Sequence, residues 1–196
     1  MCYEIIIQAL WLVLPAYIAN ASALLVGGGK PIDFGKKYKD GKRILGDGKT
    51  WAGLISGAFI GMTGGFGLSV VAKYANASEF EFLGLSDFSG FPMMIPIIAS
   101  ICFGALLGDI TESFFKRRLG IKRGEDWIPF DQVDFILGAL LFSLFISSIL
   151  NFFSFSSENW FFNSFSVWHI LILVIVTPFF HIIANYVNKK ARKINK

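Results

Sequence analysis

The chain has 196 residues, of which 54% are hydrophobic and 16% are charged, and its mean hydropathy is +0.59. This composition is too apolar for an ordinary soluble domain and predicts an integral membrane protein. The net charge of +4 is modest, and the chain has no room for a soluble basic module, so we expect no nucleic-acid partner. The two cysteines, Cys2 and Cys102, lie far apart, which argues against a disulfide framework or a zinc site.

Five stretches along the chain are long enough to cross a bilayer. A spanning helix needs about 20 mostly apolar residues, and each stretch lacks Asp, Glu, Lys and Arg. The stretches cover approximately residues 5–26, 51–72, 91–108, 135–153 and 167–187. We therefore predict an all-α, polytopic membrane protein with five transmembrane helices, which form a single membrane-embedded domain over residues 1–196.

Basic residues collect in three segments that lie between or after these stretches. Residues 27–50 hold seven of the 18 Lys and Arg residues, and residues 109–134 and 188–196 hold five each. Lysine and arginine in short loops are retained on the cytoplasmic side of a membrane. We therefore predict a multi-pass protein of the cell membrane, in contact with its lipids, whose N-terminus lies outside and whose C-terminus is cytoplasmic.

Glycine recurs at every fourth position of the second stretch, at residues 53, 57, 61 and 65. This spacing places a smooth strip along one helix face, which allows another helix backbone to approach closely. We expect the strip to pack within this chain in preference to joining two copies. The oligomeric state is left open by the sequence.

Carboxylates in the basic segments need an explanation beyond topology, because the positive-inside rule accounts only for the cations. Asp109 follows the third stretch, and Asp131 and Asp134 lie where the fourth helix is expected to begin. The latter two share a helix face, and carboxylate oxygens suit Mg²⁺ bound together with substrate phosphates. The spacing is equally compatible with helix capping and salt bridges.

Continuation of the third helix beyond Gly108 would place a hydroxyl and two cations on the face of Asp109, namely Ser113, Lys116 and Arg117. This set could hold a metal-bound polyphosphate. The alternative is an amphipathic segment that binds anionic lipid headgroups.

A glycine-punctuated loop precedes the second stretch and ends in Gly48-Lys49-Thr50. It is not a Walker A loop, because Arg43 stands where that motif needs glycine and no strand precedes the loop in the expected structure. Exposed amides and a lysine beside a helix N-terminus nevertheless favour an anion. The loop therefore predicts a phosphate site.

The same segments resemble the motifs of an enzyme family. The run from Gly108 to Arg117, followed by Gly120-Ile121-Lys122 and Pro129, resembles the signature of the phosphatidate cytidylyltransferases, the CDP-diacylglycerol synthases. Lys49-Thr50-Trp51-Ala52-Gly53 resembles their Lys-Thr-Trp-Glu-Gly element. The run from Pro15 to Gly53 is similar to the short archaeal branch of that superfamily, the CDP-archaeol synthases.

Two departures from the bacterial-type motif point to the same archaeal branch. Its glycine-histidine loop is missing here, and Gln132 stands where it has arginine. The resemblance implies an enzyme that uses Mg²⁺ to transfer CMP from CTP to an isoprenoid ether lipid phosphate, 2,3-bis-O-(geranylgeranyl)-sn-glycerol 1-phosphate, with release of pyrophosphate on the cytoplasmic side. A CDP-diacylglycerol synthase acting on diacyl phosphatidate is the alternative. A small transporter is disfavoured, because the predicted spans carry no charged residue.

The resemblance also implies roles for individual residues. The expected metal ligands are Asp109, Asp131 and Asp134. The expected catalytic residues are these three together with Ser113, Lys116 and Arg117. Nucleotide or phosphate binding is expected from Asp47, Lys49, Thr50, Lys116, Arg117 and Lys122. Two further substrate contacts are expected at the first cytoplasmic boundary, Asn20 and Asp33.

Overall fold

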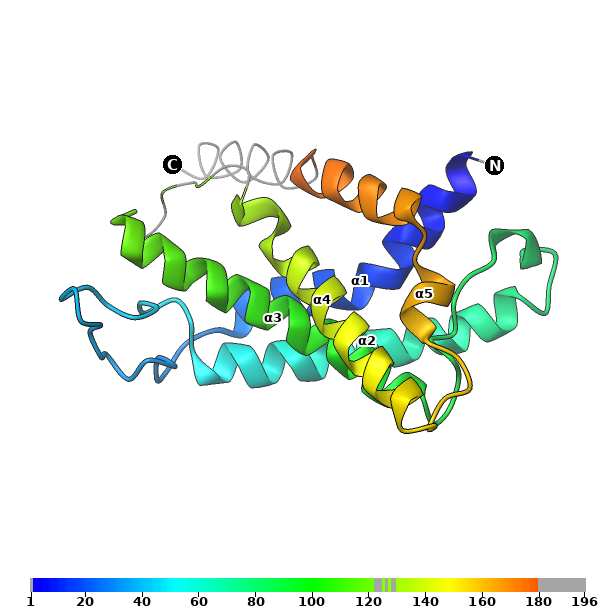
Figure 1. Cartoon of the computed structure of the whole chain (residues 1–196), viewed down its shortest axis with the longest axis horizontal. Helices are drawn as coiled ribbons and strands as arrows, with labels where there is room; N and C mark the ends of the chain where they lie inside the picture. Colours follow the sequence, from blue (N-terminus) through cyan, green and yellow to red (C-terminus); the bar gives the residue numbers. More distant parts are fainter. Residues whose placement is uncertain (1, 122–124, 126, 128–129, 180–196) are drawn as a thin grey trace.

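The computed structural model describes residues 2–121, 125, 127 and 130–179, and this part of the chain is helical apart from loops and two isolated β-bridges (Figure 1). The long helices are α1 (Cys2–Val26), α2 (Trp51–Ala75), α3 (Met94–Leu119) and α4 (Phe130–Phe152). Shorter elements are the 3-10 helix η1 (Glu81–Leu83), α5 (Trp160–Ser164) and a helix over Val167–Phe179. The predicted all-α class is confirmed for the described residues.

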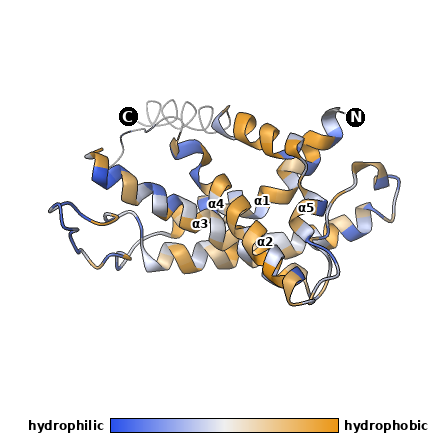
Figure 2. Ribbon diagram, viewed as in Figure 1, coloured by the Kyte–Doolittle hydropathy of each residue, from blue (hydrophilic) through white to orange (hydrophobic). Residues whose placement is uncertain are grey.

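Among the described residues, four helices are long and apolar enough to cross a membrane, over Tyr3–Val26, Trp51–Ala75, Met94–Leu119 and Phe130–Phe152. They correspond to the first four predicted stretches, and Figure 2 shows their hydrophobic character against the polar loop that joins α1 to α2. The fifth predicted stretch is helical over Val167–Phe179. Its remainder and the basic tail lie outside the described residues, so the fifth span and the orientation of the termini stay predictions.

The third helix continues past Gly108 as far as Leu119. It ends at Gly120, whose backbone adopts a left-handed conformation with φ 80° that closes the last turn. Basic side chains fill that last turn, where they interact favourably with the negative end of the helix dipole. Asp109 therefore lies within α3 and not at its end.

The glycine strip of α2 packs against α1. A Cβ atom added at Gly57 would lie 2.8 Å from both the Ala19 carbonyl oxygen and the Ala23 Cβ atom, and one added at Gly61 would lie 3.0 Å from the Ala19 Cα atom. No side chain larger than hydrogen fits these positions without a shift of α1. Packing of the strip within this chain is thereby confirmed.

Glycines also bring α3 and α4 into backbone contact. A Cβ atom at Gly104 would lie 2.6 Å from the Gly138 carbonyl oxygen, and one at Gly138 would lie 2.8 Å from the Gly108 Cα atom. A Cβ atom at Gly108 would in turn collide with the Asp134 carbonyl group. This crossing places Asp109, the neighbour of Gly108, beside the first turns of α4.

The polar segments meet at one end of the molecule, which we call the basic end. It holds the α1–α2 loop (residues 27–50), the last turns of α3 and the first turn of α4, at the left of Figure 1. Arg118 of α3 donates a hydrogen bond of 2.9 Å to Asp40 of the loop, and Lys42 Nζ donates one of 2.9 Å to the Arg118 carbonyl oxygen. The Arg118 guanidinium also lies 4.8 Å from the centre of the Tyr38 ring. These contacts dock the α1–α2 loop on α3.

Candidate active site

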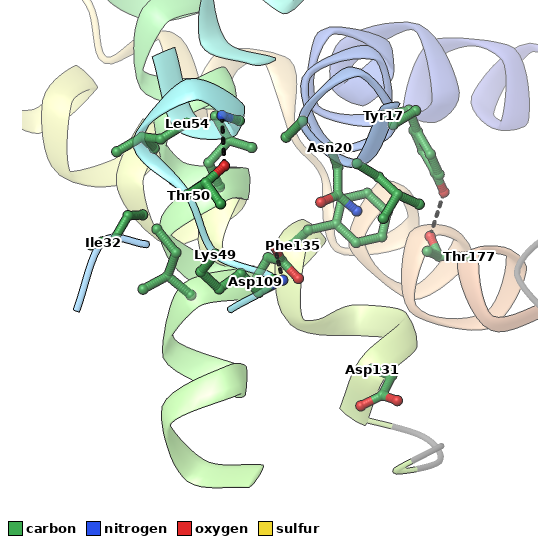
Figure 3. A pocket seen from close by; sticks show the side chains of 17 residues that line it. Tyr17, Asn20, Ile32, Lys49, Thr50, Leu54, Asp109, Asp131, Phe135 and Thr177 are labelled. Atoms are coloured by element: carbon green, nitrogen blue, oxygen red, sulfur yellow. Dashed lines mark hydrogen bonds and ion pairs between the residues drawn. The ribbon is translucent and has the colours of Figure 1, made fainter. Parts of the chain in front are cut away.

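A pocket of about 520 Å³ opens at the basic end. Its walls come from α1, the end of the α1–α2 loop, α2, α3, α4 and the helix over Val167–Phe179 (Figure 3). The polar residues that line it are Tyr17, Asn20, Lys49, Thr50, Asp109, Asp131 and Thr177. All five long apolar stretches predicted from the sequence thus converge with the end of the α1–α2 loop on one cavity.

Thr50 fixes the loop that carries Lys49. It is the N-cap of α2, and its hydroxyl oxygen accepts hydrogen bonds from the backbone amides of Gly53 at 3.1 Å and Gly28 at 3.2 Å. The Lys49 carbonyl oxygen accepts a hydrogen bond of 2.8 Å from the amide of Ile32. The two ends of the α1–α2 loop are therefore tied together, and the backbone beside the pocket is held in place.

Lys49 and Asp109 form an ion pair across the pocket wall (Figure 3). The Lys49 Nζ atom lies 2.5 Å from Asp109 Oδ2, and each side chain keeps about a quarter of its surface exposed, 23% and 24%. The pair joins the loop to α3 and leaves both groups accessible from the cavity. A cation and an anion presented in this way can each contact one part of a metal-bound phosphate.

Three carboxylates form a cluster at the α3–α4 crossing. Asp109, Glu112 and Asp134 each present one oxygen such that all three oxygens lie within 4.8 Å of one another. Mg²⁺ prefers oxygen ligands and is commonly held by carboxylates together with substrate phosphates, so the donor set fits this ion. The structure thus brings together two of the predicted metal ligands, Asp109 and Asp134, with a third carboxylate that the sequence analysis did not assign. The i, i+3 spacing of Glu112 from Asp109 is the signal that would have found it.

Asp131 lies beside this cluster in contact with Lys116. The Lys116 Nζ atom lies 2.6 Å from Asp131 Oδ2 and 3.2 Å from Glu112 Oε1, and the Trp127 amide donates a 2.9 Å hydrogen bond to Asp131 Oδ2. Asp131 Oδ1 is buried and has no hydrogen-bond partner among the described residues. Asp131 also lines the pocket. Lys116 therefore links α3 to the start of α4 and neutralises two carboxylates at once.

The remaining predicted residues fall in different places. Asn20 lines the pocket, whereas Asp47 is exposed and pairs with Arg43 at 2.7 Å outside the pocket lining. Ser113 is buried, with its hydroxyl 3.5 Å from Glu112 Oε2. Arg117 Nε is buried and donates no hydrogen bond within the described part of the chain. Lys122 lies outside the described residues.

Asp33 organises the α1–α2 loop. Its carboxylate, fully shielded from solvent, accepts hydrogen bonds of 2.8 to 3.2 Å from the Arg43 guanidinium and from the amides of Gly35, Leu45 and Gly46. Burial opposes ionisation of this group, but these hydrogen bonds outweigh burial and hold the pKa of Asp33 well below its ordinary value. Asp33, predicted as a substrate contact, orders in this structure the loop that carries Lys49.

Tyr17 closes the back of the pocket through contacts that no local sequence pattern predicts. Its hydroxyl lies 2.7 Å from the Thr177 hydroxyl, 160 residues away, and its ring packs edge-on against Phe135 at 5.1 Å between ring centres (Figure 3). The helix over Val167–Phe179 is thereby joined to α1 and α4 at the cavity.

A family model described as CarS-like, CDP-archaeol synthase, matches residues 2–194. The chain belongs to the CDP-archaeol synthase family. The family predicted from the sequence motifs is therefore confirmed, and with it the prediction of an enzyme.

Individual CDP-archaeol synthases are similar over nearly the whole chain. The synthase of Methanosarcina mazei is 39% identical over 178 residues, which are 89% of this chain and 93% of the relative. That of Thermococcus onnurineus is 39% identical over 186 residues, which are 95% of this chain and 93% of the relative. The synthase of Methanocorpusculum labreanum is 42% identical over 171 residues, which are 86% of this chain and 90% of the relative. A solved structure of an intramembrane enzyme for archaeal membrane lipid biosynthesis superposes with a TM-score of 0.68 at 34% identity and covers 91% of this chain and 92% of that chain.

Proposed function

We propose that this chain transfers CMP from CTP to 2,3-bis-O-(geranylgeranyl)-sn-glycerol 1-phosphate. A lipid phosphate oxygen attacks the α-phosphorus of CTP, the bond from that phosphorus to the oxygen bridging to the β-phosphate breaks, and pyrophosphate leaves. The attacking phosphate is already ionised at neutral pH, so no side chain has to remove a proton. Membership of the CDP-archaeol synthase family supports the reaction class.

The observation that carries the proposal is the ion pair in the pocket between Lys49 and Asp109, which is also a member of the acidic cluster. Asp109, Glu112 and Asp134 would hold Mg²⁺, and Asp131 is a further ligand candidate beside them. Magnesium bound there would neutralise charge on the attacking and leaving phosphate oxygens. A cation bound there would also relieve the repulsion between ionised carboxylates this close to one another.

Cationic side chains around the cluster complete the site. Lys49 donates to a phosphate oxygen of the nucleotide. Thr50 fixes the loop that carries Lys49, because its hydroxyl oxygen accepts hydrogen bonds from the amides of Gly53 and Gly28. Lys116 holds Asp131 and Glu112 in place and offsets the charge of the triphosphate. Family resemblance extends the nucleotide- or phosphate-binding set to Ser113, Arg117, Asp47 and Lys122, and Asn20 contributes a polar contact on the pocket wall.

We place the reaction on the cytoplasmic side of the cell membrane. The pocket lies at the basic end, where the docked α1–α2 loop carries seven of the 18 Lys and Arg residues. Two geranylgeranyl chains can remain in the bilayer there while the lipid phosphate meets soluble CTP. The boundary position of the pocket suits a reaction between one water-soluble and one membrane-bound substrate.

Pyrophosphate release by the detergent-purified protein tests this function. CTP and Mg²⁺ are supplied with either the geranylgeranyl ether lipid phosphate or diacyl phosphatidate. We expect release with the ether lipid and none when CTP or Mg²⁺ is omitted. Turnover with phosphatidate alone would assign the alternative substrate, and silence with both lipids in folded protein would refute the proposal.

A further inference from the structure

A second pocket, of about 510 Å³, lies between α3 and α4, and we call it the α3–α4 groove. Its walls are apolar side chains such as Leu107, Phe115, Leu137 and Leu141. Leu137 and Leu141 are 43% and 67% exposed, so this side of the helix pair faces outwards, towards the membrane interior in a spanning protein.

The helix crossing itself produces the hollow. Gly104, Gly108 and Gly138 form the floor of the groove, where α3 and α4 touch backbone to backbone and no side chain of the described residues fills the space between the walls. The residues that α3 contributes run from Gly104 to Phe115. At ~1.5 Å per residue this is a channel about 16 Å long, which follows the helix axis from mid-span to the basic end.

The polar residues of the groove are concentrated towards its basic end. Glu112 and Asp134 line it there, while towards Gly104 the lining is apolar. These two carboxylates also belong to the acidic cluster, whose third member, Asp109, lines the pocket that holds Lys49. The cluster is therefore a common wall between a polar pocket and an apolar groove.

We propose that the α3–α4 groove binds an isoprenoid chain of the lipid phosphate substrate, with the phosphate at Glu112 and Asp134 and CTP on the opposite side of the cluster. This inference rests on the proposed function. An amphiphile with one anionic end matches the groove, because its chain contacts the apolar walls while its phosphate reaches Lys116 and the carboxylates that would hold Mg²⁺. Approach of the two substrates from opposite sides also suits in-line attack, in which attacking and leaving oxygens lie on opposite sides of the phosphorus.

Photolabelling locates the chain without requiring turnover. The probe is a glycerol phosphate with an ether-linked chain that carries a diazirine, bound to the full-length protein in lipid nanodiscs. We expect labelled peptides from α3 and α4 around Leu107, Leu137 and Leu141, with labelling suppressed by unlabelled geranylgeranyl ether lipid phosphate. Uniform labelling that includes the outer face of α2 and resists competition would show ordinary boundary lipid and overturn the proposal, whatever the catalytic activity.

A matched pair of variants tests the groove kinetically. Leu141→Trp fills the groove, whereas Ile55→Trp adds the same ring at a similarly exposed site of α2 (63%) that lines neither pocket. We expect Leu141→Trp to raise KM for the ether lipid at least tenfold with KM for CTP unchanged, and Ile55→Trp to leave both within twofold. An unchanged lipid KM in folded Leu141→Trp, or an equal effect of both variants, would overturn the proposal. The proposed function is refuted by a different result, namely no pyrophosphate release by the unmodified protein.

Discussion

Glu112 provides the sharpest test of the acidic cluster, because the structure and the sequence motifs differ on the third carboxylate. The sequence motifs imply Asp131 as the third ligand, whereas the structure groups Glu112 with Asp109 and Asp134. Replacing Glu112 by Gln keeps the size and hydrogen-bonding capacity of the side chain and removes its charge. We predict a weaker affinity for Mg²⁺, which would be seen as a higher Mg²⁺ concentration at half-maximal activity.

The separation of the oxygens sets the size of this effect. The three carboxylate oxygens lie within 4.8 Å of one another, and two unit charges at that distance repel by about 3 kcal/mol at an effective dielectric constant of about 20. A bound divalent cation is attracted by each carboxylate charge at least as strongly as two carboxylates at this separation repel one another, so removal of the Glu112 charge removes at least one contribution of this size. One contribution alone corresponds to roughly 100-fold in affinity, and we expect a shift of about this size.

The assay is pyrophosphate release over a range of Mg²⁺ concentrations, together with Mn²⁺ binding to the free protein followed by electron paramagnetic resonance. Glu81→Gln, at the opposite end of the molecule, is the control for loss of one acidic charge. Asp131→Asn should lower activity with a smaller shift in Mg²⁺ dependence, because Asp131 lies beside the three clustered carboxylates and is not one of them. An unchanged Mg²⁺ and Mn²⁺ dependence in folded Glu112→Gln, with a large shift in Asp131→Asn, would refute the structural ligand set and favour the set expected from the motifs.

Three further changes test the site and the packing that positions it. Lys49→Met should lower kcat in the pyrophosphate assay about 10²–10³-fold, which is the typical loss when one donor to a developing charge is removed. Lys39→Met, in the exposed part of the same loop, is the control and should leave this rate unchanged. Asp33→Asn should speed trypsin cleavage of the α1–α2 loop at neutral pH. Because the pKa of Asp33 is lowered in the folded protein, its contribution to loop stability is complete above the unfolded pKa of about 4 and is lost only as the pH falls further. The unmodified loop should therefore stay equally resistant to trypsin from pH 8 to 5. A resistance to trypsin that declines over this range would contradict the role of Asp33 in ordering the loop. Gly61→Ala should lower the stability by about 1–3 kcal/mol, because the added methyl group overpacks against α1. Gly67→Ala has open space around it and should be neutral or raise the stability by up to ~1 kcal/mol. Thermal unfolding in detergent measures both effects.

The α1–α2 loop shows how far local sequence can reach. Its glycines, its cations and the Lys49-Thr50 pair predicted a phosphate site before α2, and the structure places both residues in the pocket lining. The same reasoning could not distinguish the structural role of Asp33 from the surface position of Asp47, because the two carboxylates differ in how deeply the folded loop buries them. Asp33 accepts hydrogen bonds from its own loop, whereas Asp47 lies on the surface.

The sequence by itself determined the membrane class, four of the apolar helices, the family and most of the charged residues around the site. These features depend on composition, on runs of about 20 apolar residues and on short motifs, all of which are local properties of the chain. Tertiary structure decided which charges meet. The crossing of α3 and α4 at their glycines brings Glu112 and Asp134 to Asp109, and Tyr17 reaches Thr177 across 160 residues. Such contacts follow from how helices pack in three dimensions, because the partner of a side chain on one helix is set by the crossing point and rotation of another helix distant in sequence.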